Sequence, residues 1–124
     1  MKNILVIEDD QLVSAAIKRV LTKQNYEVVL AANGFEGVKV LEHETPDLII
    51  TDILMPGMDG IQFILKLRNE NNSVVPIIAI SGGGRESAQG YLESAEVLGA
   101  DMTLKKPFTD EVLIKEVKLL TERI

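Results

Sequence analysis

Short apolar runs alternate with longer amphipathic segments along the whole chain. The runs are apolar at nearly every position, which is typical of strands buried on both faces of a parallel sheet. Strands are therefore expected at residues 4–7, 28–31, 48–51, 76–80 and, shortest of all, 102–104. Between the runs, apolar residues recur at helical spacing, which indicates helices with one face in the core. Helices are expected over residues 11–24, 34–43, 59–68, 87–98 and 109–122.

Five strands alternating with five helices predict an α/β fold, because short connections between parallel strands require helical crossovers. The expected architecture is a doubly wound parallel sheet with helices on both faces. In such sheets the ligand site lies outside the carboxyl ends of the strands. The chain has 124 residues, which suits one domain over residues 1–124 with a core that needs no metal or disulfide.

Polar residues mark the ends of the predicted elements. Most acids at these boundaries are interpreted as helix caps or solvated turn residues. This interpretation applies to Asp10, Asp47, Asp59 and Asp101. Thr109 is expected to cap the last helix, and Asn33 followed by Glu36 resembles a capping pair at the second.

A second set of polar residues follows directly after the apolar runs. Asp52 ends the run at 48–51 just before a turn rich in Pro and Gly. The other members follow the first, fourth and fifth runs in the same way, and they are Glu8, Asp9, Ser81 and Lys106. Because the carboxyl ends of parallel strands lie at one edge of a sheet, these side chains are expected to meet.

Composition narrows the chemistry that such a site can perform. The chain has no cysteine and a single histidine, His43, so a metal must be held by oxygen ligands. Thirteen Lys and Arg against nineteen Asp and Glu give a net charge of -6 without a basic run, which argues against direct nucleic-acid binding. No stretch has the length of a signal-peptide core or a membrane span, so a cytoplasmic location without membrane attachment is expected.

Three carboxylates in one cleft repel one another and call for positive charge. Mg²⁺ suits them because it prefers oxygen ligands and is commonly held by carboxylates together with phosphate oxygens. Lys106 supplies a second positive charge, and the Ser81 hydroxyl can hydrogen-bond an incoming anion. A carboxylate in these surroundings fits a nucleophile that accepts a phosphoryl group, and Asp52 is the candidate.

Two other functions compete with a phosphorylation-controlled signalling module. A Mg²⁺-dependent phosphatase acting on small phosphate esters prefers an Asp-x-Asp pair, and Asp52-Ile53-Leu54 lacks the second Asp. An interaction domain with a vestigial acidic site is the other alternative, and the full set of site residues argues against it. No separate small-molecule substrate is expected, so the protein is not interpreted as an independent enzyme.

Four motifs together resemble the motif set of response regulator receiver domains, the CheY-like family. They are Val6-Ile7-Glu8-Asp9-Asp10, the stretch from Ile50 to Gly60, Ala79-Ile80-Ser81-Gly82, and Leu104-Lys105-Lys106-Pro107-Phe108. The match spans essentially the whole chain. The resemblance implies a flavodoxin-like (βα)5 fold, with a five-stranded parallel sheet in the order 2-1-3-4-5.

The resemblance also implies a role for each matching residue of the acidic site. Asp52 would be phosphorylated by a histidine kinase or a histidine phosphotransfer protein of a two-component or phosphorelay system. Glu8 and Asp9 would hold Mg²⁺, or Mn²⁺, together with Asp52 and the backbone carbonyl of Leu54.

For the phosphoryl group itself, the resemblance implies contacts from Ser81 and Lys106. Lys106 would precede Pro107 across what is often a cis peptide bond in this family. The domain would promote its own phosphorylation and dephosphorylation, with no further substrate.

Output in the family involves movement of the switch serine, here Ser81, and a face formed by the fourth helix, fifth strand and fifth helix. That face would bind a downstream protein. This chain has Thr103 where the family commonly places an aromatic residue, three positions before the lysine, so output is expected to take another route. The chain is interpreted as a stand-alone regulator, with a receiver fragment of a larger multidomain regulator or kinase as the alternative.

Overall fold

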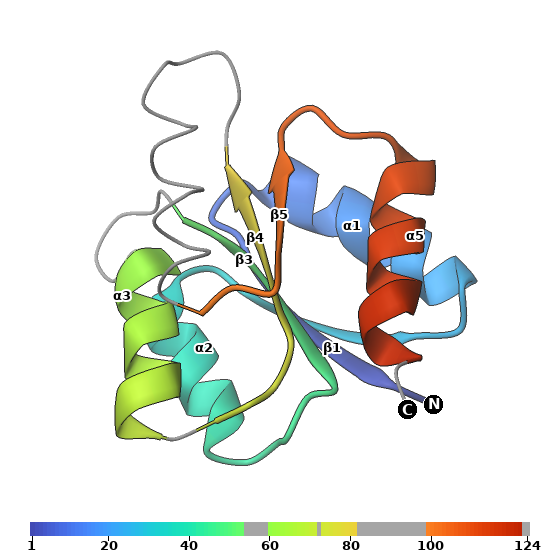
Figure 1. Ribbon diagram of the computed structural model, residues 1–124. Coiled ribbons are helices and arrows are strands. Elements are labelled where there is room, and N and C mark those ends of the chain that lie inside the picture. Colours follow the sequence, from blue (N-terminus) through green and yellow to red (C-terminus); the bar gives the residue numbers. More distant parts are fainter. Residues whose placement is uncertain (54–59, 72, 82–98, 123–124) are drawn as a thin grey trace.

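The chain folds into a five-stranded parallel sheet with helices on both faces (Figure 1). The computed structural model describes residues 1–53, 60–71, 73–81 and 99–122. The strands are β1 (Asn3–Ile7), β2 (Glu27–Ala31), β3 (Leu48–Asp52), β4 (Ile77–Ser81) and β5 (Met102–Lys105). Their order is β2-β1-β3-β4-β5, and every neighbouring pair is parallel, which confirms the predicted sheet.

The helices cover the sheet in two layers. They are α1 (Gln11–Lys23), α2 (Gly34–Leu41), α3 (Gly60–Leu65), the π-helix η1 (Lys66–Glu70) and α5 (Asp110–Thr121). Figure 1 shows α1 and α5 on one face of the sheet and α2 and α3 on the other. The helix predicted over 87–98 lies outside the described residues.

Side chains that accept hydrogen bonds from free backbone amides begin three of these helices. The Asp10 carboxylate accepts from the amide of Leu12 at 2.9 Å, so its interpretation as a cap is confirmed. Asn33 caps α2 by accepting from the amide of Glu36 at 2.9 Å, and Thr109 caps α5. Each cap satisfies an amide that the first turn of a helix leaves without a carbonyl partner. Asp59 lies outside the part of the chain that the structure describes.

The core consists of two apolar clusters separated by the sheet. Alternate residues of β1 point to opposite faces, so Ile4 and Val6 belong to the cluster under α1 and α5. Leu5 and Ile7 belong to the cluster under α2 and α3. Burial on both faces explains why the strands are continuous apolar runs in the sequence.

Three element ends differ from the sequence prediction. The third helix does not end at Arg68 but continues to Glu70 as a π-helix, in which the amide of Asn71 donates to the carbonyl of Lys66 at 3.1 Å. Asp52 and Ser81 are the last residues of β3 and β4 rather than the first residues after them. The sheet therefore fixes the backbone of both.

No helix among the described residues is long and apolar enough to cross a membrane.

Candidate functional site

The sequence-predicted site residues come together at the carboxyl edge of the sheet. Glu8 and Asp9 follow β1, Asp52 and Ser81 end β3 and β4, and Lys106 follows β5. Hydrogen bonds of the sheet continue past the strand ends, since the Glu8 amide donates to Ala31 at 3.0 Å and the Ile53 amide to Ile80 at 3.0 Å. The site thus stands on the hydrogen-bonded carboxyl edge of the sheet, which is the location expected in a doubly wound fold.

Three carboxylates form the centre of this site. Oxygen atoms of Glu8, Asp9 and Asp52 lie within 4.8 Å of one another. Glu8 and Asp52 are 2% and 5% exposed, whereas Asp9 is exposed to solvent. This set fits a hard divalent cation, because Mg²⁺ prefers carboxylate oxygens and retains several waters, which the exposed side of the cluster would admit.

Lys106 connects two of the three carboxylates. Its Nζ lies 2.5 Å from Glu8 Oε1 and 3.1 Å from Asp52 Oδ2. The Lys106 amide donates to the carbonyl of Ser81 at 2.8 Å, so the residue is held by its backbone as well as its side chain. The peptide bond between Lys106 and Pro107 is cis, which confirms the expectation from the resemblance.

Burial and charge alter the protonation of both partners of this ion pair. Burial, the largest cause, and the nearby Asp52 together raise the pKa of Glu8 to about 7, while the hydrogen bond from Lys106 acts in the opposite direction. Burial alone lowers the pKa of Lys106, but Glu8 and Asp52 outweigh this effect and the net shift is upward. Lys106 therefore stays charged at neutral pH, whereas Glu8 is poised to exchange its proton.

The Ser81 hydroxyl is buried and has no hydrogen-bond partner among the residues that the structure describes. A buried polar group without a partner carries a free-energy cost of about 1–3 kcal/mol, so it is uncommon in folded proteins. This unused hydrogen-bonding capacity stands at the last position of β4, next to the strand that carries Asp52. It is available to a group that enters the site.

Two further sequence-predicted residues do not belong to this cluster as described. Leu54, whose backbone carbonyl is a predicted metal ligand, lies outside the described residues. Thr103 is paired with Ala79 inside the sheet, two residues before the end of β5, and is half-buried.

Sequence reasoning missed two residues that support the acids. The amide of Asp10 donates to Glu8 Oε2 at 3.3 Å, so the residue that caps α1 also orients the buried glutamate. Gly60 packs against the end of β3, where a Cβ would collide with the carbonyl oxygen of Asp52 and come within 2.6 Å of Ile53 Cα. Gly60 ends the Pro- and Gly-rich stretch of the sequence, and that composition is the signal that could have pointed to it.

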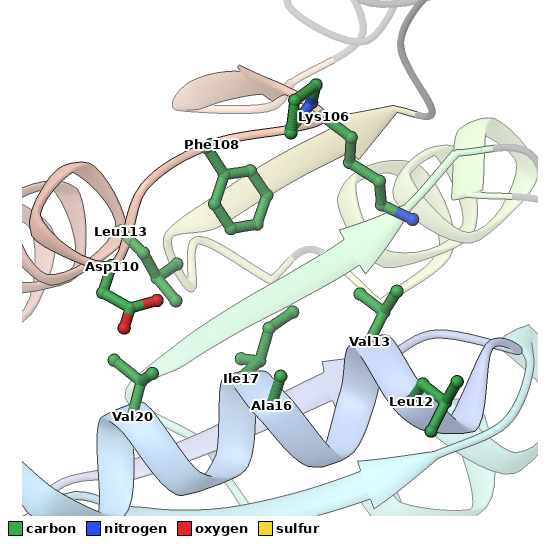
Figure 2. A pocket seen from close by; sticks show the side chains of 10 residues that line it. Leu12, Val13, Ala16, Ile17, Val20, Lys106, Phe108, Asp110 and Leu113 are labelled. Carbon is green, nitrogen blue, oxygen red and sulfur yellow. The ribbon is translucent and has the colours of Figure 1, made fainter.

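An apolar groove adjoins the acidic cluster between α1 and α5 (Figure 2). Its volume is about 360 Å³, and Leu12, which is 84% exposed, stands on its rim. Figure 2 shows Lys106 toward one end, with Leu12 and Val13, and Asp110 toward the other, with Val20. The other lining residues are Ala16, Ile17, Pro107, Phe108 and Leu113. Lys106 therefore belongs both to the groove and to the acidic site.

Fold and site together define a class of protein: a doubly wound α/β domain with paired acids, an aspartate and a lysine at the carboxyl edge of its sheet. Comparison with known proteins identifies the class by family: the model of the response regulator receiver domain matches residues 4–118. The chain belongs to this family, which functions in two-component signalling.

Relatives and solved structures agree with this assignment. The transcriptional regulatory protein AfsQ1 of Streptomyces coelicolor is 32% identical over 123 residues, which cover 99% of this chain and 52% of that protein. The response regulator MprA of a Mycobacterium species is 32% identical over 97% of this chain and 50% of its own. The chain thus spans about half the length of these curated relatives.

Among solved structures, a putative response regulator from Chloroflexus aurantiacus is 31% identical, with a TM-score of 0.89 and 98% of each chain covered. The receiver domain of the Francisella response regulator 1452 is 28% identical, also with a TM-score of 0.89, over 99% of this chain and 98% of that one. The similarity extends over the whole fold described above.

Proposed function

We propose that this domain, over residues 1–124, is a signalling receiver in which Asp52 accepts a phosphoryl group from a phosphohistidine. The donor would be a histidine kinase or a histidine phosphotransfer protein of a two-component or phosphorelay system. One observation carries the proposal: a single lysine reaches Asp52 and Glu8 at 3.1 and 2.5 Å, in a cluster that Asp9 completes.

In the proposed reaction an Asp52 carboxylate oxygen attacks the phosphorus atom. The P–O bond forms as the P–N bond to the donor imidazole breaks, and the electron pair leaves with the ring nitrogen, which then takes up a proton. The Lys106 ammonium would contact the phosphoryl oxygens as negative charge develops on them. The Ser81 hydroxyl would donate a hydrogen bond to one of these oxygens.

Carboxylates of Glu8, Asp9 and Asp52, and by analogy the carbonyl of Leu54, would hold Mg²⁺ or Mn²⁺. A bound ion supplies positive charge for the phosphoryl oxygens. Burial is the main cause of the raised pKa of Glu8, about 7, and the neighbouring Asp52 adds to it. Three acids gather around one lysine here, so a divalent cation would balance the charge of the cluster.

Phosphorylation by a small-molecule donor tests this proposal. Incubation with Mg²⁺ and acetyl phosphate is expected to give one labile phosphoryl adduct by intact mass. Asp52→Asn removes it, and EDTA prevents it in the native chain. The matched control is Asp47→Asn, which changes an exposed acid bound to the amide of Asn3 at the opposite edge of the sheet and keeps the adduct. No adduct on the native chain, or an undiminished one on the Asp52 variant, would overturn the proposal.

The groove between α1 and α5 supports a helical protein donor. Its walls are apolar and its two ends carry Lys106 and Asp110, so it suits a helix that presents aliphatic side chains between charged ones. A donor bound there lies next to Asp52, because Lys106 contacts both places. The same reaction would serve a stand-alone regulator that acts by partner binding and a receiver within a larger regulator or kinase.

Output is proposed to use the face of the fourth helix, β5 and α5, of which the structure describes β5 and α5. Thr103 is half-buried on β5 and would take part in a route that does not use an aromatic side chain.

A further inference from the structure

Arg68 connects three backbone segments near the beginnings of β4 and β5, at the end of the sheet opposite the acidic site. It lies on the π-helix η1, and its guanidinium donates from Nε and Nη2 to the carbonyl of Gly99 at 3.1 and 2.9 Å. Nη1 donates to the carbonyl of Ser73 at 3.0 Å, and Nη2 reaches Asp101 Oδ2 at 3.1 Å. The Arg68 side chain is 17% exposed, so these bonds are largely shielded from water. A planar guanidinium can make such a set of bonds, whereas a lysine cannot.

Asp101 turns this cluster into an anchor for the start of β5. Its Oδ2 accepts from the amide of Ile77 at 2.9 Å, and its own amide donates to the carbonyl of Ile77 at 2.9 Å. Asp101 lies in an exposed bend, which agrees with its interpretation as a turn residue, but its side chain also joins the beginnings of β4 and β5, which was not predicted. Arg68 bonds to the same Oδ2 atom and fixes its position.

Gly99 fits under Arg68 with little space to spare. Its φ is +129°, a conformation that side chains other than hydrogen rarely permit, and a Cβ there would lie 2.8 Å from Arg68 Cγ. The π-helix changes the rotation of the side chains around the helix axis relative to an α-helix, and η1 aims Arg68 at this glycine. Arg68 on η1 thus bonds to both Gly99 and Asp101 and links them to the helix.

The anchor matters because β5 is short, lies at the edge of the sheet and carries Lys106 at its far end. It has four residues, pairs in the sheet with β4, and passes directly into Lys106, whose amide donates to Ser81 at 2.8 Å. A strand advances about 3.3 Å per residue and turns its side chains over at each step. A slip of one residue would therefore move Lys106 by more than the 3.1 Å that separates its Nζ from Asp52 Oδ2.

We propose that Arg68 is a positioning residue for Lys106, acting through Gly99 and Asp101 to hold β5 in register with β4. The inference uses the geometry of the metal-free chain, and its link to phosphoryl transfer rests on the function proposed above. It predicts that loss of Arg68 loosens β5 and Lys106 before it loosens the centre of the sheet.

Amide hydrogen exchange of the metal-free protein tests the structural part. In Arg68→Ala, the Lys106 amide is expected to exchange about tenfold faster relative to the Glu8 amide, which is bonded to Ala31 of β2 on the far side of the central strand from β5. Arg68→Lys gives a smaller effect of the same kind and serves if the alanine variant does not fold. Lys66→Ala, which breaks an exposed ion pair with Glu70 on the same π-helix, leaves the ratio unchanged. Equal acceleration of both amides in the Arg68 variants would show general destabilisation and overturn the proposal.

Phosphorylation kinetics test the functional part. With acetyl phosphate and Mg²⁺, Arg68→Ala is expected to slow modification of Asp52 about threefold or more, because the hydrogen bonds that hold the start of β5 are lost and Lys106 is less well positioned. In a Lys106→Ala background it has no further effect, because the residue through which it acts is absent. Equal slowing with and without Lys106 would overturn the positioning role. Failure of the native chain to be phosphorylated would instead reject the proposed function and leave the exchange result standing.

Discussion

At the scale of single residues, the site is defined by an excess of buried negative charge. Glu8 and Asp52 are both buried, and Lys106 lies between them as the cation that the structure places there. Two buried carboxylates sharing one ammonium cannot both be fully compensated, and the consequence appears at Glu8, whose pKa burial raises to about 7. The charged form of Glu8 therefore lowers the stability of the folded chain at the proposed phosphorylation site.

This imbalance makes stability depend on pH in a defined window. The pKa of Glu8 is about 7 in the folded chain and near its ordinary value of 4.5 when unfolded, so the folded state binds the proton more tightly. The stabilising effect is complete below pH 4.5 and is lost as pH rises toward 7. In EDTA, the free energy of unfolding is expected to fall by roughly 1–3 kcal/mol between pH 5 and pH 8.

Urea unfolding of the Glu8→Gln variant at a series of pH values checks this expectation. The variant has no titrating group at this position, so most of the fall should disappear. Glu44→Gln, which changes an exposed glutamate, retains it. Parallel pH profiles for the native chain and the Glu8 variant would show that Glu8 keeps an ordinary pKa in the folded state.

At the scale of elements, the strands and helices differ in how much of them the sequence predicts. Strand positions follow from continuous apolar runs, and the convergence of Glu8, Asp52 and Lys106 follows from the rule that parallel strands end at one edge. The π-helix does not follow from any local pattern, because Arg68 and Glu70 are ordinary helix residues. Asp101 shows the same limit: its local signal is that of a turn, and its role comes from strand pairing.

The approach of α3 to the end of β3 gives a test at this scale. In Gly60→Ala the new methyl group would meet the backbone of Asp52 and Ile53, neither of which can move without disturbing the sheet. In Gly37→Ala the nearest atoms are the side-chain ends of Ile7 and Phe63, at 2.6 and 3.2 Å, which can rotate away. Inside α2, the change at Gly37 gains about 1 kcal/mol of helix propensity, whereas Gly60 is the first residue of α3 and gains less.

Gly60→Ala is therefore expected to lose about 2 kcal/mol or more of stability, and Gly37→Ala clearly less. Denaturant unfolding of the two variants side by side measures the difference. The Gly60 variant should also be phosphorylated more slowly at Asp52, because the methyl group displaces the backbone that carries this residue. Equal stability of the two variants would mean that the turn before α3 can relax around a side chain.

At the scale of the whole molecule, the fold brings the proposed phosphorylation site and the proposed donor-binding groove together through one residue. Lys106 ends the β5 segment anchored by Asp101, contacts Asp52 and lines the groove between α1 and α5. The sequence predicts α1 and α5 as amphipathic helices but not the space between them, since a groove depends on how two distant elements pack. Leu12 illustrates this: it fits the apolar spacing of α1 and is nevertheless 84% exposed.

A charged substitution at Leu12 separates recognition from chemistry. Because its side chain is almost fully exposed, Leu12→Asp should leave the free energy of unfolding nearly unchanged. Its carboxylate would enter the apolar wall against which a donor helix packs, and transfer from a phosphorylated histidine phosphotransfer domain is expected to slow about tenfold or more. Val74→Asp, at a residue that is 91% exposed and outside the groove, should leave transfer unchanged. Transfer at the native rate by the Leu12 variant would place the donor on another surface, whereas slowing with acetyl phosphate as well would indicate damage to the site itself.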